Sequence, residues 1–183
     1  MAVKNKIISN PNTGQSIKFL QTAKDTGGKL LEMESTYGAH SKEPAAHYHP
    51  HQSEDFVVLT GEVMVRINGQ VKILKQNDTL HIPKNTIHAM WNNGDEKAVV
   101  HWRVQPAMNT EYLLETGMGL AQDGKAKNHG MPVFLQTVLI ADKFSAVYRL
   151  PKPPFAVQKV LFTLLKPIAY LTGHRPTYRK YLD

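Results

Sequence analysis

Four histidines and one glutamate lie at spacings that suit a shared chemical site. His47, His49 and His51 occupy alternate positions, and in an extended strand alternate side chains point to the same face. Glu54 begins the next extended run, after a two-residue turn that can direct its carboxylate back towards these imidazoles. His88 lies on a later predicted strand and can complete the group from across a sheet.

These side chains predict one bound divalent transition metal. Three neutral imidazoles and one carboxylate suit Fe, Ni, Mn, Zn or Cu, and they leave coordination positions open for water or substrate. The ligand types do not choose among these ions, because the same set accepts several of them. The chain has no cysteine, so thiolate ligands and disulfides are excluded.

The spacing of two groups of residues resembles the two sequence motifs of the cupin family. The first motif is matched by two histidines, a glutamate and a glycine, namely His47, His49, Glu54 and Gly61. The second is matched by a proline, a histidine and two asparagines, namely Pro83, Asn85, His88 and Asn92. Asn77 and Asn85 stand where the family has glycine, and asparagine is one of the few other residues that tolerate the left-handed backbone of a turn.

The resemblance implies a fold, a ligand set and an assembly. It implies an all-β, small antiparallel jelly-roll barrel in which His47, His49, Glu54 and His88 hold one metal. It also implies a homodimer, since cupins commonly pair. The polar start of the chain lacks the apolar core of a signal peptide, so we expect a cytoplasmic protein.

The hydrophobic pattern divides the chain into two parts. Short alternating runs predict strands up to about residue 105, and Asn68 with Gly69 is the strongest hairpin signal among them. Beyond Pro106 the spacing becomes helical, over residues 110–121, 132–144 and 155–171. We therefore expect a cupin β-barrel over residues 1–107, with its core at about 29–105. A helical extension over residues 108–183 would pack on the barrel or on a partner.

The net charge of +7 is concentrated at the end of the chain. Residues 1–142 hold 14 lysines and arginines and 14 acidic side chains. Residues 143–183 hold eight lysines and arginines but a single acidic side chain, that of Asp183. A neutral barrel argues against a nucleic-acid partner.

The helix over residues 155–171 is short and is interrupted by lysines and a proline, so it should not span a membrane. Packing on the barrel or a second subunit is the favoured interpretation. The alternatives are a lid over the barrel mouth and a weak peripheral membrane contact through this basic helix.

The function that we predict is a dioxygenase-type oxidoreductase, similar to quercetinase-like cupins, acting on a small apolar or aromatic substrate. Apolar residues near the motifs favour such a ligand over a sugar phosphate. Glu54 would bind the metal and accept the substrate's proton, and His51 would either assist beside the metal or be solvated. The alternatives are a non-catalytic small-molecule binder or sensor, and a metal-dependent isomerase, decarboxylase or lyase.

Three further residues are candidates for the barrel interior, namely Arg66, His101 and Trp102. Since strand side chains alternate, His101 and Trp102 must face opposite ways, and at most one of them lines the site. We interpret His101 and His81 as buried, hydrogen-bonded structural histidines.

Overall fold

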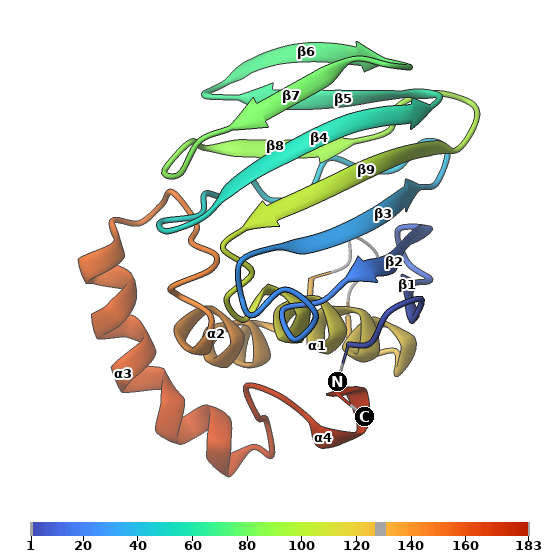
Figure 1. Cartoon of the computed structure of the whole chain (residues 1–183). Coiled ribbons are helices and arrows are strands. Elements are labelled where there is room, and N and C mark those ends of the chain that lie inside the picture. Colours follow the sequence, from blue (N-terminus) through green and yellow to red (C-terminus); the bar gives the residue numbers. More distant parts are fainter. Residues whose placement is uncertain (1, 127–130, 183) are drawn as a thin grey trace.

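The structure is a computed structural model, and it describes residues 2–126 and 131–182. In this part of the chain, strands come first and helices follow (Figure 1). The strands are β1 (Ile7–Asn10), β2 (Gln15–Gln21), β3 (Leu31–Tyr37), β4 (Ser53–Thr60), β5 (Glu62–Ile67), β6 (Gln70–Lys75), β7 (Thr79–Ile82), β8 (His88–Trp91) and β9 (Ala98–Gln105). The helices are α1 (Thr110–Gln122), α2 (Phe134–Lys143), α3 (Phe155–Leu171) and α4 (Arg179–Leu182).

The strands form two antiparallel sheets that face each other. The larger sheet has the order β1-β2-β3-β9-β4-β7, and the smaller one has the order β6-β5-β8. Buried side chains from both sheets, among them Phe56, Val58, Val65 and Val100, make one apolar cluster between them. This confirms the predicted jelly-roll fold with a helical extension after the strands.

Three turns adopt the left-handed backbone that the sequence predicted. Asn68 and Gly69 have φ values of 48° and 90° between β5 and β6, as expected of a tight hairpin. Asn77 and Asn85 have φ values of 72° and 65°. Asparagine therefore replaces glycine at these two cupin positions without changing the turn.

Gly61 lies where the backbone passes close to the start of β9. Its φ is 72°, and a Cβ atom added there would lie 2.9 Å from the carbonyl oxygen of Lys97. The chain therefore bends at Gly61 with its backbone close to that of Lys97 and Ala98.

The N-terminal segment contributes two strands to the larger sheet. β1 and β2 both join its edge, and Ile17 and Phe19 are fully buried in a second cluster with Leu31 and Met33. β1 is short, and only Ile8 and Asn10 of its four residues are buried, whereas Ile7 is exposed.

The helices lie together at one end of the two sheets (Figure 1). α1 packs against β1, and α2 packs against α3 on the outside of the molecule. α3 has the predicted bounds, but its main run of apolar side chains does not pack on the barrel. Among the described residues, no helix has the length and hydrophobicity needed to cross a membrane.

Candidate metal centre

Backbone pairing brings the two histidine segments together. The amide of His47 donates to the carbonyl oxygen of His88 at 3.0 Å, and the amide of His88 donates to the carbonyl oxygen of His47 at 2.8 Å. The amide of Asn85 also donates to the carbonyl oxygen of His49 at 2.8 Å. Residues that are about forty positions apart in the sequence are thus held side by side by an antiparallel bridge.

The three imidazole rings are oriented in the same way. The Nδ1 atoms of His47, His49 and His88 lie 3.2, 2.5 and 3.0 Å from the backbone carbonyl oxygens of Ala45, Val147 and Thr86. A carbonyl can only accept, so each Nδ1 carries the proton and each Nε2 keeps its lone pair. This is the arrangement in which histidines bind metals through Nε2.

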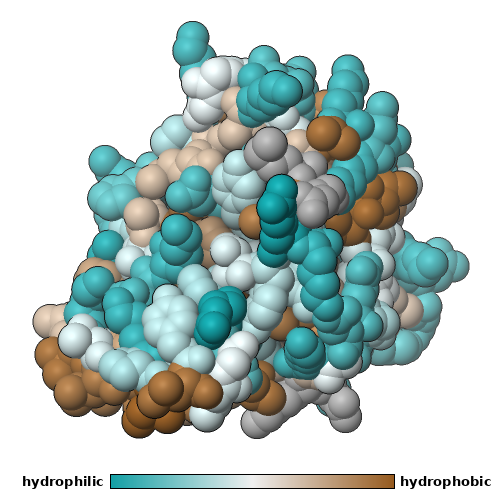
Figure 2. Space-filling model, turned by 90° about the horizontal axis from the view of Figure 1, so that it is seen from below, coloured by the Kyte–Doolittle hydropathy of each residue, from teal (hydrophilic) through white to brown (hydrophobic). Residues whose placement is uncertain are grey.

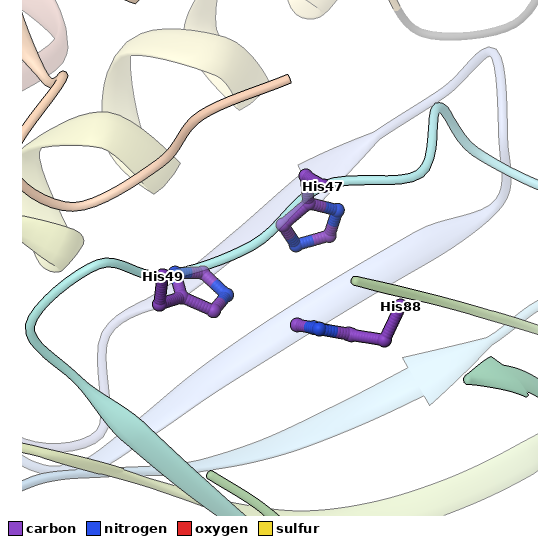
Figure 3. A group of neighbouring side chains, drawn as sticks. All are labelled: His47, His49 and His88. Atoms are coloured by element: carbon purple, nitrogen blue, oxygen red, sulfur yellow. The ribbon is translucent and has the colours of Figure 1, made fainter. Parts of the chain in front are cut away.

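The ring nitrogens of His47, His49 and His88 converge on one space (Figure 3). One nitrogen from each ring can be chosen so that all three lie within 4.8 Å of one another. Nitrogens that share one metal ion at about 2.0–2.1 Å lie at most about 4.2 Å apart, so binding an ion would require only a small inward movement of these rings. The three histidines can therefore hold a metal ion.

The carboxylate of Glu54 lies beside the imidazoles of His49 and His88. It is the second residue of β4, is almost fully buried, and its Oε2 lies 3.2 Å from Nε2 of His49 and 2.9 Å from Nε2 of His88. The geometry leaves His49 Nε2 and Glu54 Oε2 without hydrogen-bond partners among the described residues. Buried polar atoms without partners are rare, and a cation between them would satisfy both.

The pKa values of Glu54, His49 and His47 are shifted by burial and by one another. Burial would raise the pKa of Glu54, but the neighbouring His49 and His88 outweigh it and hold that pKa well below its usual range. At His49 burial would lower the pKa, but the carboxylate of Glu54 outweighs this and raises it. Burial, together with repulsion from His88 and His49, lowers the pKa of His47 to about 3. Glu54 is therefore an anion and His47 a neutral imidazole at neutral pH.

The four side chains open onto a cavity of about 320 Å³. Its barrel wall is largely aromatic and apolar, formed by Tyr37, Phe56, Met90 and Trp102. The helical extension supplies the opposite wall, including Leu113, Leu114, Met118 and Ile140. Among the residues that the structure describes, no lysine or arginine lines this cavity.

Two residues of the extension that the sequence analysis missed touch the histidines directly. The ring of Tyr148 stacks on His47 with centroids 4.6 Å apart, and the carbonyl of Val147 is the partner of His49 Nδ1. The backbone groups of Tyr48 and Arg149 exchange two hydrogen bonds of 3.0 Å. These bonds hold residues 147–149 of the extension against residues 47–49. No local spacing signals such a contact, since about one hundred residues separate its two sides.

The remaining predicted residues lie in different surroundings. His51 is exposed and outside the cavity lining, so the structure gives its predicted catalytic role no support and agrees with the solvated alternative. Trp102 lines the cavity, whereas His101 faces away and contacts Glu32 at 2.9 Å.

His81 and Arg66 also find partners away from the cavity. His81 contacts Asp55 at 2.7 Å, but its side chain is exposed, so the prediction of a buried histidine is wrong at this position. Arg66 forms a two-pronged pair with Glu43, at 2.6 and 2.9 Å. Neither residue contributes to the metal centre.

Comparison with known proteins agrees with the fold. The sequence model of the family described as Cupin domain matches residues 33–104, which include all four predicted ligands. Residues 33–104 of the chain are therefore similar to the cupin domain family.

Two curated relatives match parts of this region. Quercetin 2,3-dioxygenase of Bacillus subtilis is 31% identical over 78 residues, which are 42% of this chain and 23% of that protein. Mannose-1-phosphate guanylyltransferase of Salmonella typhimurium is 41% identical over 46 residues, which are 25% of this chain and 10% of that protein. The chain thus spans less than a quarter of either relative.

Among solved structures, a predicted oxalate decarboxylase from Thermotoga maritima is similar with a TM-score of 0.50 and 18% identity. The alignment covers 58% of this chain and 99% of that one. At this level of identity the likeness establishes the shared fold alone.

Proposed function

We propose that the chain is a mononuclear metal-dependent oxidoreductase of the cupin dioxygenase type, acting on a small apolar or aromatic substrate. The observation that carries the proposal is the position of the three histidines and Glu54 at the wall of a largely apolar cavity. Functional pockets combine an apolar lining with a few converging polar groups in this way.

The metal would be held by the Nε2 atoms of His47, His49 and His88 and by the carboxylate of Glu54. Three nitrogens and one oxygen suit Fe, Ni, Mn, Cu or Zn. When bound, the metal supplies a Lewis acid and, for the redox-active ions, a centre that can exchange electrons with dioxygen.

Glu54 is the residue best placed to handle a proton. Its Oε1 accepts a hydrogen bond of 3.0 Å from Nε1 of Trp102, which fixes the orientation of the carboxylate. Because the carboxylate is ionised and faces the cavity, it can take a proton from a substrate hydroxyl bound within hydrogen-bond reach. Trp102 and the stacked ring of Phe56 exclude water from that side of the group.

The cavity lining supports an uncharged substrate. Recognition of a phosphate commonly uses arginine or lysine, and neither lines the cavity among the described residues. The aromatic rings of Phe56, Trp102 and Tyr148 instead offer surfaces on which a planar ring can stack. The matched part of a quercetin dioxygenase agrees with a substrate of this kind.

Oxygen uptake tests the proposal. Metal-free protein is reloaded with Fe, Ni, Mn or Cu and assayed with flavonols and β-diketones. We expect oxygen consumption equal to the substrate consumed, lost in His47→Ala and kept in His51→Ala, whose side chain is exposed. Binding without oxygen uptake would replace the proposal by a non-catalytic binder or sensor. Conversion without oxygen uptake would replace it by an isomerase, decarboxylase or lyase.

A further inference from the structure

α3 presents a continuous apolar stripe to solvent. Six large side chains on one face of the helix are between 43% and 88% exposed, namely Val157, Val160, Leu161, Leu164, Ile168 and Leu171. Their spacing of three and four residues places them along a single line on the helix surface. Brown, apolar surface gathers at the lower left of Figure 2, the side on which α3 lies in Figure 1.

A different face of α3 is already used for packing. Gln158, Phe162 and Ala169 are buried, and α3 packs against α2. Lys159 and Lys166 both reach Asp142 of α2, at 3.1 and 2.8 Å. These contacts fix the rotation of the helix about its axis, so the exposure of the stripe follows from how α3 is held.

The charge around the stripe has one sign. Residues 131–182 contain eight lysines and arginines but a single acidic residue, Asp142. Asp142 is already paired with two lysines of α3. Lys152, just before the helix, and Arg175, just after it, are exposed. A half-exposed tyrosine, Tyr170, lies on the same helix, and tyrosine favours the boundary between water and lipid.

We propose that α3 docks the protein onto the surface of an anionic lipid bilayer. The stripe would lie in the boundary between headgroups and acyl chains, parallel to the surface, and the basic side chains would contact the headgroups. A second copy of the chain fits this face less well. Pairing through the stripe would bring together two basic surfaces, each with one acidic residue that is already engaged.

Vesicle sedimentation with the full-length, metal-loaded protein tests this inference. We expect binding to vesicles of phosphatidylcholine with roughly one third phosphatidylglycerol, and much weaker binding to phosphatidylcholine alone. Raising the salt to roughly 0.5 M should weaken binding, because the headgroup attraction is screened. The double variant Leu161→Ser, Leu164→Ser should bind at least about tenfold more weakly, because two large apolar side chains no longer enter the lipid.

A matched control lies on the opposite part of the molecule. Val71 and Ile73 on β6 are 42% and 50% exposed, so Val71→Ser, Ile73→Ser removes similar apolar surface far from α3. This variant should bind vesicles as the parent does, and thermal unfolding should show that both variants are folded.

Three results would overturn the inference. These are no binding of the parent to anionic vesicles, equal loss of binding in both double variants, or a parent dimer in light scattering that only the α3 variant converts to monomer. The last result would assign the stripe to a second copy. Oxygen uptake and metal content do not enter this test, so it stands or fails separately from the proposed activity.

Discussion

Nε1 of Trp102 donates a hydrogen bond of 3.0 Å to Oε1 of Glu54, and these two residues come from neighbouring strands of the larger sheet. β4 and β9 pair so that Phe56 lies opposite Trp102, which places the indole one diagonal step from Glu54 on the same face. The other carboxylate oxygen of Glu54 is then left for His49 and His88. Sheet register thus determines which carboxylate oxygen of Glu54 faces the histidines.

Trp102→Phe should weaken metal binding without unfolding the protein. The substitution removes the hydrogen bond to Glu54 but keeps an aromatic ring against Phe56. The Glu54 carboxylate would therefore lose its fixed orientation, while the packing around it is kept. Substituting a residue that hydrogen-bonds to a metal ligand typically lowers the metal affinity by about tenfold or more. Competition with a chromophoric chelator measures this, and Trp91→Phe, at a tryptophan outside the cavity lining, is the control. Equal affinities of parent and Trp102→Phe would contradict the role given to this hydrogen bond.

The metal-free protein should lose stability as the pH falls below about 6.5, in part through His47. The pKa of His47 is about 3 in the folded protein, against an ordinary value of 6.5. Between these two pH values the unfolded chain binds a proton at His47 and the folded chain does not. Stability therefore falls with pH across this window. Between pH 6.5 and 5 the contribution is about 2 kcal/mol.

Urea unfolding in chelator at the two pH values measures this difference. His47→Gln should lose less stability than the parent over the same interval. His49 contributes in the opposite sense, because its raised pKa gives stability that is present below 6.5 and lost as the pH rises. An equal pH dependence in parent and His47→Gln would show that His47 does not titrate as inferred.

Gly61→Ala should destabilise the fold more than Gly69→Ala. Both glycines have positive φ, so both substitutions introduce backbone strain of about 1 kcal/mol or more. Only at Gly61 would the new Cβ also collide with backbone, at the carbonyl of Lys97, whereas Gly69 has open space. Denaturant unfolding gives both values. A smaller loss at Gly61 would contradict the close approach of the two strands.

Gly117→Leu should block the cavity without weakening the fold. Gly117 lines the cavity in α1, and an added Cβ meets no atom within 4 Å. Replacing a glycine within a helix removes a penalty of up to about 1 kcal/mol, so stability should stay level or rise. Metal content should be unchanged while binding of an apolar probe falls at least about tenfold, because the leucine occupies the cavity. Unchanged probe binding would place the ligand elsewhere.

Gly119→Ala is the matched comparison two residues along the same helix. Its Cβ would collide with the ring of Tyr181, so this variant should destabilise the contact between α1 and α4 and leave the cavity as it is. Thermal unfolding and probe binding together distinguish the two glycines. Loss of probe binding in both variants would show that damage to α1, not filling of the cavity, is responsible.

Local regularities made much of this protein predictable. The alternation of strand side chains indicated that His47 and His49 share a face, and the hairpin at Asn68 and Gly69 followed from turn chemistry. The bounds of α3 followed from helical spacing alone. In each case the signal lies within a few residues of the feature that it predicts.

Contacts between distant segments were not predictable in the same way. The same alternation suggested that His51 would join the other histidines, but the chain bends at Pro50 and His51 is exposed. Tyr148 reaches His47 only because the extension folds back over the barrel. The periodicity of α3 defined an apolar face but not what that face would meet, and the six stripe residues are exposed where packing was expected.

The measurement that tests the central claim most directly is metal content by plasma mass spectrometry. Tag-free protein purified without chelators is compared with His88→Ala and with His51→Ala, the latter altering an exposed histidine outside the site. We predict close to one transition-metal ion per chain in the parent and in His51→Ala, and a loss of at least about tenfold in His88→Ala, which removes one of the predicted ligands. A parent that is empty and cannot be reloaded, or a metal that persists in His88→Ala, would contradict the metal centre described above.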